Sequence, residues 1–274
     1  MNARAVAARA AARLDAIAIP DSRLEAEILT RHAMGLDRAA FFAGAEIDSD
    51  RTALLDALIA RRAAGEPAAY ITGEREFYGL AFAVGPGVLV PRPETELLVD
   101  VAINFLRDRP GSVVVDIGTG SGCVAVAVAA HAPDTRVVAI DRSTDALAWA
   151  RANVARHRAP VSLVRGNLAE PLARADVVLA NLPYIPTGEI HHLQREIRDF
   201  EPRSALDGGP DGLDLIRRLV ADCGFRLRPS LLALEVGAGQ AQAVARLAQE
   251  AGAAGITIVP DLAGIDRVVS AQWA

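Results

Sequence analysis

Residues 1–69 show the hydrophobic spacing of amphipathic helices. Apolar side chains recur every three or four positions, as at Leu24 and Ile28 and again at Leu54 and Leu58, so they share one face of a helix. The pattern predicts helices over residues 3–17, from Asp21-Ser22 to Met34, and from Asp48-Ser49 to just before Gly65. Asp and Ser are typical caps at a helix start, and Gly at a helix end. We expect a small helical bundle with no catalytic grouping in it.

From residue 112 onward, short apolar runs alternate with longer amphipathic stretches. Strands are predicted over residues 113–117, 136–141, 161–165, 176–180, 230–236, 255–259 and 266–272. Helices are predicted over residues 122–131, 144–157, 211–222 and 240–251. Strands separated by helical crossovers form a parallel, doubly wound sheet. The last two strands are joined by only a short loop, so we expect them to pair antiparallel at one side of the sheet.

The region between these two patterns predicts a connector and the start of a helix. Residues 70–90 carry β-branched and aromatic residues around glycines, which is typical of a hairpin-like connector. Pro91-Arg92-Pro93-Glu94-Thr95-Glu96 then leads into a helical run from Leu97 to Leu106, with proline and acidic residues in its first turn. The predicted organisation is a helical domain (residues 1–69), a connector (70–90) and a larger α/β domain (91–274).

Composition narrows the class of protein. A chain of 274 residues, 51% hydrophobic and 23% charged, suits two unequal domains with proper cores. No apolar stretch approaches the ~20 residues of a membrane span, and the start lacks a signal-peptide core, so we expect a soluble cytoplasmic protein. The net charge of −5 argues against broad contact with nucleic-acid phosphates but leaves room for a local basic patch. A protein or small molecule is the favoured substrate class.

A glycine turn follows the first strand of the larger domain. It consists of Gly118, Thr119, Gly120, Ser121 and Gly122. Glycines let the backbone approach a ligand closely, and the following helix offers unsatisfied N–H groups. The spacing is GxGxG rather than the GxGxxG of dinucleotide sites. Asp116 on the strand can receive the ammonium end of a methionine moiety, whereas its negative charge would repel a pyrophosphate. The turn therefore favours S-adenosyl-L-methionine as cofactor.

Two further strand ends could contribute to that cofactor site. Asp141 ends the second strand, where a carboxylate can accept both ribose hydroxyls; the alternative is a helix cap beside Ser143. Asn167 and Leu168 follow the third strand, where the amide can bond the adenine amine and Leu168 can cover the ring. The alternative there is that Gly166-Asn167 is an ordinary turn.

The fourth strand runs into Asn181, Leu182, Pro183 and Tyr184, a sequence suited to a planar NH2 substrate. An amide or aromatic amine is a poor nucleophile because its lone pair is delocalised. If Asn181 Oδ1 and the carbonyl of Leu182 each accept one N–H, the nitrogen is oriented without a strong base. Tyr184 would stack on the flat group and Pro183 would stiffen the loop. The alternative is a simple Asn-X-Pro turn with Tyr184 in the core.

The sequence does not predict a metal site, a disulfide framework or a hydrolase active site. His191-His192 do not predict a metal pair, because adjacent side chains point apart on a helix and no acidic ligand lies at the usual spacing. Cys123 and Cys223 have no paired spacing, so we expect neither a disulfide framework nor a zinc site but two buried apolar residues. No GxSxG motif is present, which argues against hydrolase chemistry.

With these residues in hand, the chain resembles the peptide chain release factor N5-glutamine methyltransferases, the HemK/PrmC family. The strings that carry the resemblance are Tyr70-Ile71-Thr72-Gly73, Glu76-Phe77-Tyr78-Gly79, Pro91-Arg92-Pro93-Glu94-Thr95-Glu96, Asp116 to Gly122, Asn181 to Tyr184, Glu201-Pro202-Arg203-Ser204-Ala205-Leu206, Gly209-Pro210-Asp211-Gly212-Leu213 and Leu234-Glu235-Val236-Gly237. The PRPETE and EPRxAL strings make it specific, because amino methyltransferases acting on DNA or RNA share the glycine turn and an NPPY-type loop.

The resemblance implies a class I S-adenosylmethionine-dependent methyltransferase fold. This is a Rossmann-like, mostly parallel seven-stranded sheet with an antiparallel last strand, plus a small N-terminal helical domain that helps hold the substrate. The implied reaction methylates the side-chain amide of the glutamine in the GGQ tripeptide of bacterial class 1 release factors. The glycine turn, Asp141 and Asn181 match the family's cofactor-contacting positions, and residues 181–184 match its glutamine-binding loop.

The chain departs from the family pattern at three positions. Leu182 replaces the first proline of NPPY, although the expected contact there is a backbone carbonyl; Asn167 stands where an acidic residue is common, and Leu168 where an aromatic is common. The rival enzyme class is an adenine or guanine amino-methyltransferase of DNA or rRNA, which the acidic charge and the absence of a basic, aromatic-rich insert disfavour. The non-enzymatic rival is a nucleotide-binding interaction module.

Overall fold

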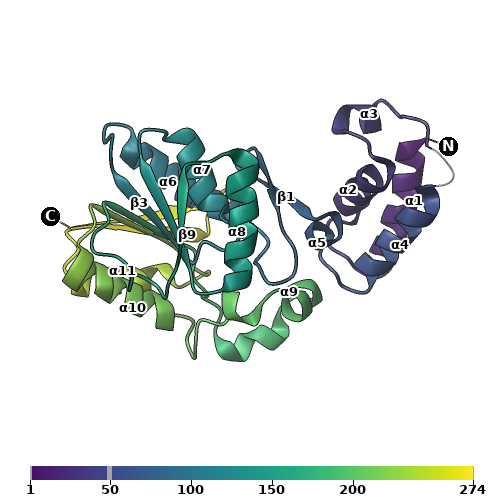
Figure 1. Cartoon of the computed structure of the whole chain (residues 1–274). Helices are drawn as coiled ribbons and strands as arrows, with labels where there is room; N and C mark the ends of the chain where they lie inside the picture. Colours follow the sequence, from purple (N-terminus) through teal and green to yellow (C-terminus); the bar gives the residue numbers. More distant parts are fainter. Residues whose placement is uncertain (1, 48–50, 274) are drawn as a thin grey trace. The chain divides into compact units, whose positions relative to one another are not determined.

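The computed structural model describes residues 2–47 and 51–273 of the chain. The chain divides into two compact units (Figure 1). One consists of the residues up to Glu74 together with Gln194–Phe200, and the other of Arg75–Leu193 together with the residues from Glu201 onward. Each unit has its own hydrophobic core.

The first unit is helical, as its apolar spacing predicts. Its helices are α1 (Ala3–Asp15), α2 (Ser22–Met34), α3 (Arg38–Phe42), α4 (Thr52–Ala63), α5 (Ala68–Thr72) and α9 (Arg195–Phe200). Apolar side chains of α1, α2 and α4 meet in its core, among them Leu14, Leu29 and Ile59. Removing these faces from water is the main term that holds the short helices together.

Details of the helical unit differ from the sequence-based expectation. Asp21 lies at the N-cap of α2, but its left-handed backbone, with φ of 50°, does not direct the side chain to a capping hydrogen bond. Residues 70–72, expected in the connector, complete α5, where Thr72 Oγ1 donates back to the carbonyl of Ala68 at 3.1 Å. The helix start expected at Asp48-Ser49 lies outside the described residues.

A buried ion-pair cluster attaches α9 to this unit. The Arg62 guanidinium, 1% exposed, contacts the carboxylates of Glu25 and Glu196. Two carboxylates around one buried arginine satisfy the charge, and losing any partner would leave an uncompensated buried ion. Nothing in the local sequence of residues 194–200 indicates that they belong with helices more than a hundred positions earlier.

The second unit contains the seven-stranded sheet. Its strands are β3 (Val113–Ile117), β4 (Arg136–Asp141), β5 (Val161–Arg165), β6 (Val177–Ala180), β7 (Leu231–Glu235), β8 (Gly255–Pro260) and β9 (Asp266–Gln272). Their order is β5-β4-β3-β6-β7-β9-β8, and β9 runs antiparallel to both neighbours while the pairs from β5 to β7 are parallel. The predicted mostly parallel sheet with an antiparallel last strand is confirmed.

Helices cover both faces of this sheet (Figure 1). They are α6 (Glu96–Leu106), α7 (Cys123–His131), α8 (Thr144–His157), α10 (Asp214–Asp222) and α11 (Ala241–Glu250). The first three share a core with Val114, and the last two share a core with Val115 and Ile117. Because strand side chains alternate between faces, Asp116 belongs to the same face as Val114 and points toward α7.

Shorter elements flank the sheet. The hairpin-like region contains β1 (Glu74–Phe77) paired with β2 (Leu80–Ala83), and Phe77 and Phe82 pack edge to face at 6.1 Å. Short helical turns are η2 (Pro93–Thr95), η3 (Thr187–His192), η4 (Arg203–Ala205) and the π-turn η5 (Cys223–Leu227). In the described part of the chain, no helix has the length and apolar character to span a membrane.

Candidate active site

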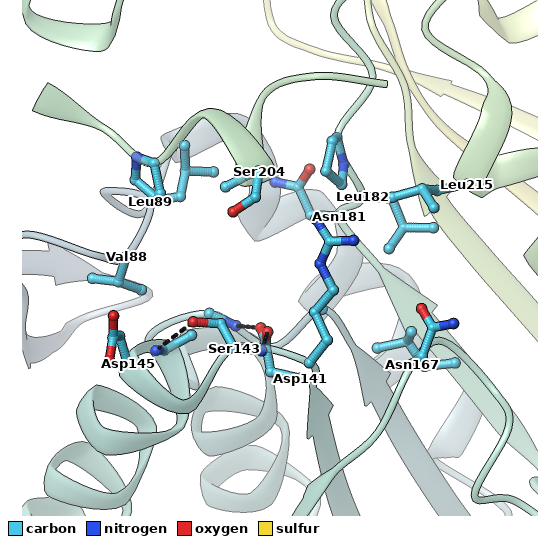
Figure 2. Close-up of a pocket in the computed structure, with 18 of the residues that line it drawn as sticks. Val88, Leu89, Asp141, Ser143, Asp145, Asn167, Asn181, Leu182, Ser204 and Leu215 are labelled. Atoms are coloured by element: carbon cyan, nitrogen blue, oxygen red, sulfur yellow. Dashed lines mark hydrogen bonds between the residues drawn. The ribbon is translucent and has the colours of Figure 1, made fainter. Parts of the chain in front are cut away.

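A cavity of about 210 Å³ opens at the carboxyl ends of β3, β4, β5 and β6 (Figure 2). This is the edge at which doubly wound sheets bind ligands, next to the point where the strand order reverses. The predicted site residues that line it are Gly118, Gly120, Asp141, Asn167, Leu168, Asn181, Leu182 and Pro183. The structure thus brings together residues from four strand ends. Asp116, Thr119, Ser121, Gly122 and Tyr184 are not among its lining residues.

The glycine turn presents bare backbone to the cavity. The N–H groups of Gly118 and Thr119 both donate to the carbonyl of Ile140, at 2.8 and 3.0 Å, which fastens the turn to the end of β4. Gly118 has φ of 74°, and a Cβ there would lie 3.2 Å from Leu182 Cδ2. A side chain at Gly118 would therefore strain the backbone and crowd the loop that follows β6.

Asp141 supports the turn and faces the cavity at once. Its Oδ2 accepts the N–H of Gly120 at 3.0 Å, and its Oδ1 accepts the N–H of Ser143 at 2.8 Å. The N-cap of α8 is Ser143, whose hydroxyl accepts the N–H of Ala146, so Asp141 is not the cap. A carboxylate oxygen can accept more than one hydrogen bond, so both oxygens keep acceptor capacity toward a ligand.

Asp116 lies beneath the turn rather than on the cavity wall. It is 2% exposed, and its Oδ2 accepts the Thr119 hydroxyl at 2.5 Å and the N–H of Ala125 at 3.2 Å. Burial raises the pKa of Asp116 to about 6, against the lowering effect of these hydrogen bonds. The alternation along β3 turns the carboxylate toward α7, so its contact with an ammonium group stays a prediction.

The two residues predicted to meet adenine, Asn167 and Leu168, lie just after the end of β5. Leu168 is buried with a left-handed backbone, φ of 50°, and Asn167 Nδ2 donates to Glu170 Oε1 at 2.6 Å. The same segment forms both the turn beside Gly166 and part of the cavity wall. An ordinary turn and a contact with adenine are therefore compatible interpretations of these residues. Arg142, which follows Asp141, also lines the cavity and was not predicted from the sequence.

Asn181 belongs to a polar chain that leads away from the cavity. Its Nδ2 donates to Thr95 Oγ1 at 3.0 Å, and the Thr95 hydroxyl donates to Glu235 Oε2 at 2.5 Å. The Tyr184 hydroxyl reaches the other oxygen, Glu235 Oε1, at 3.4 Å. Burial raises the pKa of Glu235 to about 7, while its hydrogen bond from Thr95 acts in the opposite direction. Burial and the Glu235 charge also raise the pKa of Tyr184.

The loop after β6 is held by main-chain pairing and close packing. Ile185 N–H donates to the carbonyl of Leu206 at 3.0 Å, and Gly208 N–H donates to the carbonyl of Ile185 at 2.9 Å. Gln240 Nε2 donates to the carbonyl of Tyr184 at 2.8 Å. At Gly212, with φ of 79°, a Cβ would lie 2.1 Å from that same carbonyl oxygen, so only glycine fits. These contacts give the loop one fixed path.

Two of the strings that carry the family resemblance meet beside the cavity. Arg92 Nη2 donates to both oxygens of Glu201, at 2.8 and 2.7 Å, and the Glu201 side chain is 1% exposed. The residues that follow, Pro202, Ser204 and Ala205, line the cavity. The sequence analysis did not single out four residues at or beside the site: Thr95, Glu235, Arg92 and Ser204. Each lies in a string that carries the family resemblance, and that position could have indicated its importance.

The remaining sequence-based expectations concern metals and cysteines. Cys123 and Cys223 are free and buried, as expected. The rings of His191 and His192 lie 3.8 Å apart, so the expectation that they point apart is wrong. Both residues are exposed and belong to the short turn η3 rather than to an α-helix. Within residues 2–47 and 51–273, no cluster of three metal-ligating side chains is found.

The cavity favours positioning over acid–base chemistry. The ionisable side chains among its described lining residues are Asp141, Arg142 and Asp145. Figure 2 shows Asp141 and Asp145 on the wall across the cavity from Asn181. Asn181 itself offers an amide, and these two carboxylates lie on the opposite wall, which suits a reaction driven by orientation of the nucleophile.

Comparison with known families identifies two regions. A family model described as PrmC N-terminal domain matches residues 5–73, and one described as Methyltransferase small domain matches residues 94–197.

Curated relatives named release factor glutamine methyltransferase are similar over most of the chain. The protein of Geobacter sulfurreducens is 42% identical over 259 residues, which cover 93% of this chain and 90% of the relative. That of Moorella thermoacetica is 42% identical over 275 residues, 97% of each chain. That of Gloeobacter violaceus is 49% identical over 215 residues, 76% of this chain and 75% of the relative.

Solved structures share the fold at low identity. The hMettl16 catalytic domain, in complex with MAT2A 3'UTR hairpin 6, matches with a TM-score of 0.59 and 14% identity over 79% of this chain and 82% of that chain. The Thermus thermophilus 16S rRNA N2 G1207 methyltransferase RsmC, in complex with AdoMet and guanosine, matches with a TM-score of 0.55 and 18% identity over 73% of this chain and 50% of that chain. The class I methyltransferase fold is confirmed.

Proposed function

Because the chain belongs to the family of release factor glutamine methyltransferases, we propose that it methylates the side-chain amide nitrogen of a release-factor glutamine. It is an S-adenosyl-L-methionine-dependent methyltransferase. One observation carries the proposal: Asn181 faces the cavity from the end of β6, across from Asp141 and beside the glycine turn. The amide of Asn181, which can accept an N–H, thus faces the same cavity as the carboxylate of Asp141, which can bind the cofactor.

The cavity fits the cofactor by its own chemistry. Gly118 and Gly120 leave room that a Cβ would fill, and Asp141 offers two oxygens with free acceptor capacity to vicinal ribose hydroxyls. Asn167 and Leu168 line the same cavity and would meet adenine. Thr119, Ser121 and Gly122 act by shaping the turn, and Asp116 by holding it from beneath. When bound, the cofactor supplies an electrophilic methyl group.

The loop after β6 orients the nucleophile. Asn181 Oδ1 accepts one N–H of the glutamine amide and the carbonyl of Leu182 accepts the other, which directs the weakly nucleophilic nitrogen toward the methyl group. Pro183 stiffens the loop. Stacking of Tyr184 on the substrate stays a prediction, and the contact that supports a structural role for this residue is its hydroxyl on Glu235.

The substrate is a folded protein in this proposal. The helical N-terminal domain, residues 1–69, would help to hold a bacterial class 1 release factor, with residues 70–90 as connector and 91–274 as catalytic domain. The target would be the glutamine of the GGQ tripeptide, and the place of action the cytoplasm, where translation ends. The match of residues 5–73 to a PrmC N-terminal domain supports this division of labour. The net charge of −5 supports a protein over a nucleic-acid substrate.

The proposal is tested by offering labelled S-adenosylmethionine with three acceptors in parallel: a class 1 release factor, duplex DNA and rRNA. Label on the release factor, and none on a release factor whose GGQ glutamine is replaced by alanine, is the expected result. Label on DNA or rRNA alone would assign the protein to the nucleobase amino-methyltransferases. Cofactor binding by calorimetry with no labelled acceptor would favour an interaction module.

A further inference from the structure

The side chain of Asn181 has two nearly superimposable orientations, and the proposed reaction uses only one. An amide carries an acceptor oxygen and a donor NH2 group of similar size. With Oδ1 in the cavity, Asn181 accepts an N–H of the substrate. With Nδ2 in the cavity, two donor groups would face each other. Catalysis therefore depends on whatever fixes the direction of this amide.

Thr95 cannot fix that direction by itself. A hydroxyl both donates and accepts, so Thr95 Oγ1 could bond either end of the Asn181 amide. Glu235 removes the ambiguity. An ionised carboxylate only accepts, so the hydrogen of Thr95 is committed to Glu235 Oε2 at 2.5 Å. Thr95 Oγ1 is then left as an acceptor, and it takes the Nδ2 hydrogen of Asn181 at 3.0 Å.

We propose that Glu235, acting through Thr95, is a positioning residue that holds the Asn181 amide with its oxygen toward the substrate. This inference rests on the proposed methylation of an NH2 group at Asn181. We call the three hydrogen-bonded residues Glu235, Thr95 and Asn181 the amide-orienting relay. The charge on Glu235 sets the direction of both hydrogen bonds in it.

The surroundings of the relay keep it dry and rigid. Thr95 is 3% exposed and Glu235 is 2% exposed, so water does not compete for their hydrogen bonds. Glu235 ends β7 on the face that packs against α6, and Thr95 lies at the start of α6, so both positions are set by backbone elements. The second carboxylate oxygen accepts the Tyr184 hydroxyl, which stops the carboxylate from rotating freely.

The charges around Glu235 set the pH at which the relay works. Glu94 and burial favour its neutral form, while Thr95, Tyr184 and Arg267 favour its ionised form, and the pKa comes to about 7. The thiol of Cys123, whose pKa burial raises to about 12, stays neutral. Below this pKa the protonated carboxyl can donate to Thr95. Thr95 is then free to donate to Asn181 Oδ1, and the wrong orientation of the amide becomes accessible.

The test uses the full chain with three variants of the relay and a matched control. Thr95→Val removes the hydroxyl while keeping the shape, Thr95→Ser keeps the hydroxyl, and Glu235→Gln keeps the shape while removing the charge. Ser270→Ala is the control, because Ser270 lies on β9 next to β7 and its hydroxyl donates to the carbonyl of Thr257, at 3.4 Å, outside the relay. Thermal unfolding of each variant identifies any that does not fold, and Glu235→Gln carries the test if Thr95→Val is one of them.

We expect kcat for release-factor methylation at about pH 8 to fall roughly tenfold in Thr95→Val and in Glu235→Gln, as for loss of one hydrogen bond to a charged network. Thr95→Ser should recover most of it, and calorimetry should show unchanged cofactor affinity in all variants. Wild-type kcat should decline as the pH falls through about 7, and the ratio of Thr95→Val to wild type should approach one at about pH 6. A purely structural role for Thr95 would not produce this convergence.

The relay would be overturned if Thr95→Val had the same kcat as the wild type. It would also be overturned if the ratio of the two kcat values were the same at about pH 8 and about pH 6. Failure of the wild-type protein to label any release factor would instead overturn the proposed function. The same ratios would then be measured on the nucleic acid that is labelled, because any NH2 substrate needs the same orientation of Asn181.

Discussion

The turn after β3 and the loop after β6 lie at the same edge of one sheet, yet they are stabilised in different ways. The turn after β3 is held by neighbours in sequence: Thr119 bonds Asp116, three positions away, and Gly120 bonds Asp141, 21 positions away. In the loop after β6, the side chain of Asn181 is held from afar: Asn181 bonds Thr95 across 86 positions, and Thr95 bonds Glu235 across 140. A ligand-binding turn can be encoded locally, whereas a reacting group here is oriented by the tertiary structure.

The two regions also use their carboxylates differently. Around the turn, Asp116 and Asp141 accept backbone N–H groups and so fix the path of the chain. Behind the loop, Glu235 accepts two hydroxyl groups and so fixes the direction of side chains. We therefore expect changes at the turn to alter cofactor affinity or stability, and changes at the loop to alter turnover.

The largest expected effect is at the loop. Asn181→Ala should lower kcat by about 100-fold or more, the scale of removing one preorganised polar partner, while the protein stays folded. Steady-state kinetics at saturating release factor and circular dichroism measure the two parts. Asn104→Ala, an exposed amide on α6 away from the cavity, is the control. A near-normal kcat would remove Asn181 from the reaction.

Next in size is Asp141→Ala at the turn. Loss of a charge-assisted contact to the cofactor should weaken binding by roughly 1.5–3 kcal/mol, that is about 10- to 150-fold in Kd. Calorimetry with S-adenosylmethionine and with its demethylated product measures this directly, and Asp134→Ala, at an exposed position before β4, serves as control. Unchanged affinity would show that Asp141 acts on the backbone alone.

Asp116→Asn should change how the stability of the protein depends on pH. The folded-state pKa of Asp116, about 6, lies above its ordinary value of 3.8, so the folded state binds the proton more tightly. The stability this proton contributes is present at low pH and is lost as the pH rises through about 6. Asn cannot lose a proton, so the unfolding free energy of wild type minus that of Asp116→Asn should fall between about pH 4 and pH 7.

Denaturant unfolding at several pH values measures that difference. If the difference in unfolding free energy does not change with pH, the pKa of Asp116 is not raised in the folded protein. Because its side chain lies beneath the turn, we also expect a smaller loss of cofactor affinity than in Asp141→Ala.

The smallest expected effect is Leu182→Pro. The proposed contact at this position is the backbone carbonyl, which proline keeps, and the change restores the commoner family motif. The Leu182 side chain is 3% exposed and packs near Gly118, so some stability should be lost. We expect kcat to change by less than about threefold. A loss comparable to that of Asn181→Ala would mean that the leucine side chain itself shapes the reacting site.

The same contrast explains what the sequence could predict. Strand positions of the sheet domain followed from short continuous apolar runs, because both faces of each central strand are buried. The cavity residues at the strand ends followed from the glycine spacing and the loop after β6. Thr95 and Glu235 were not identified, because their importance comes from a contact between residues 140 positions apart. The burial of Asp116 beneath the turn was not predicted, and its contact with an ammonium group had been inferred from residue type and order alone.

In the proposed reaction, the loop after β6 presents a glutamine side-chain amide for methylation. Tandem mass spectrometry of a release factor after reaction with the wild-type protein tests this role most directly. We expect a single added methyl group, located on the side-chain nitrogen of the GGQ glutamine, and its near absence with Asn181→Ala. A methyl group on another residue, or full methylation of that glutamine by Asn181→Ala, would contradict it.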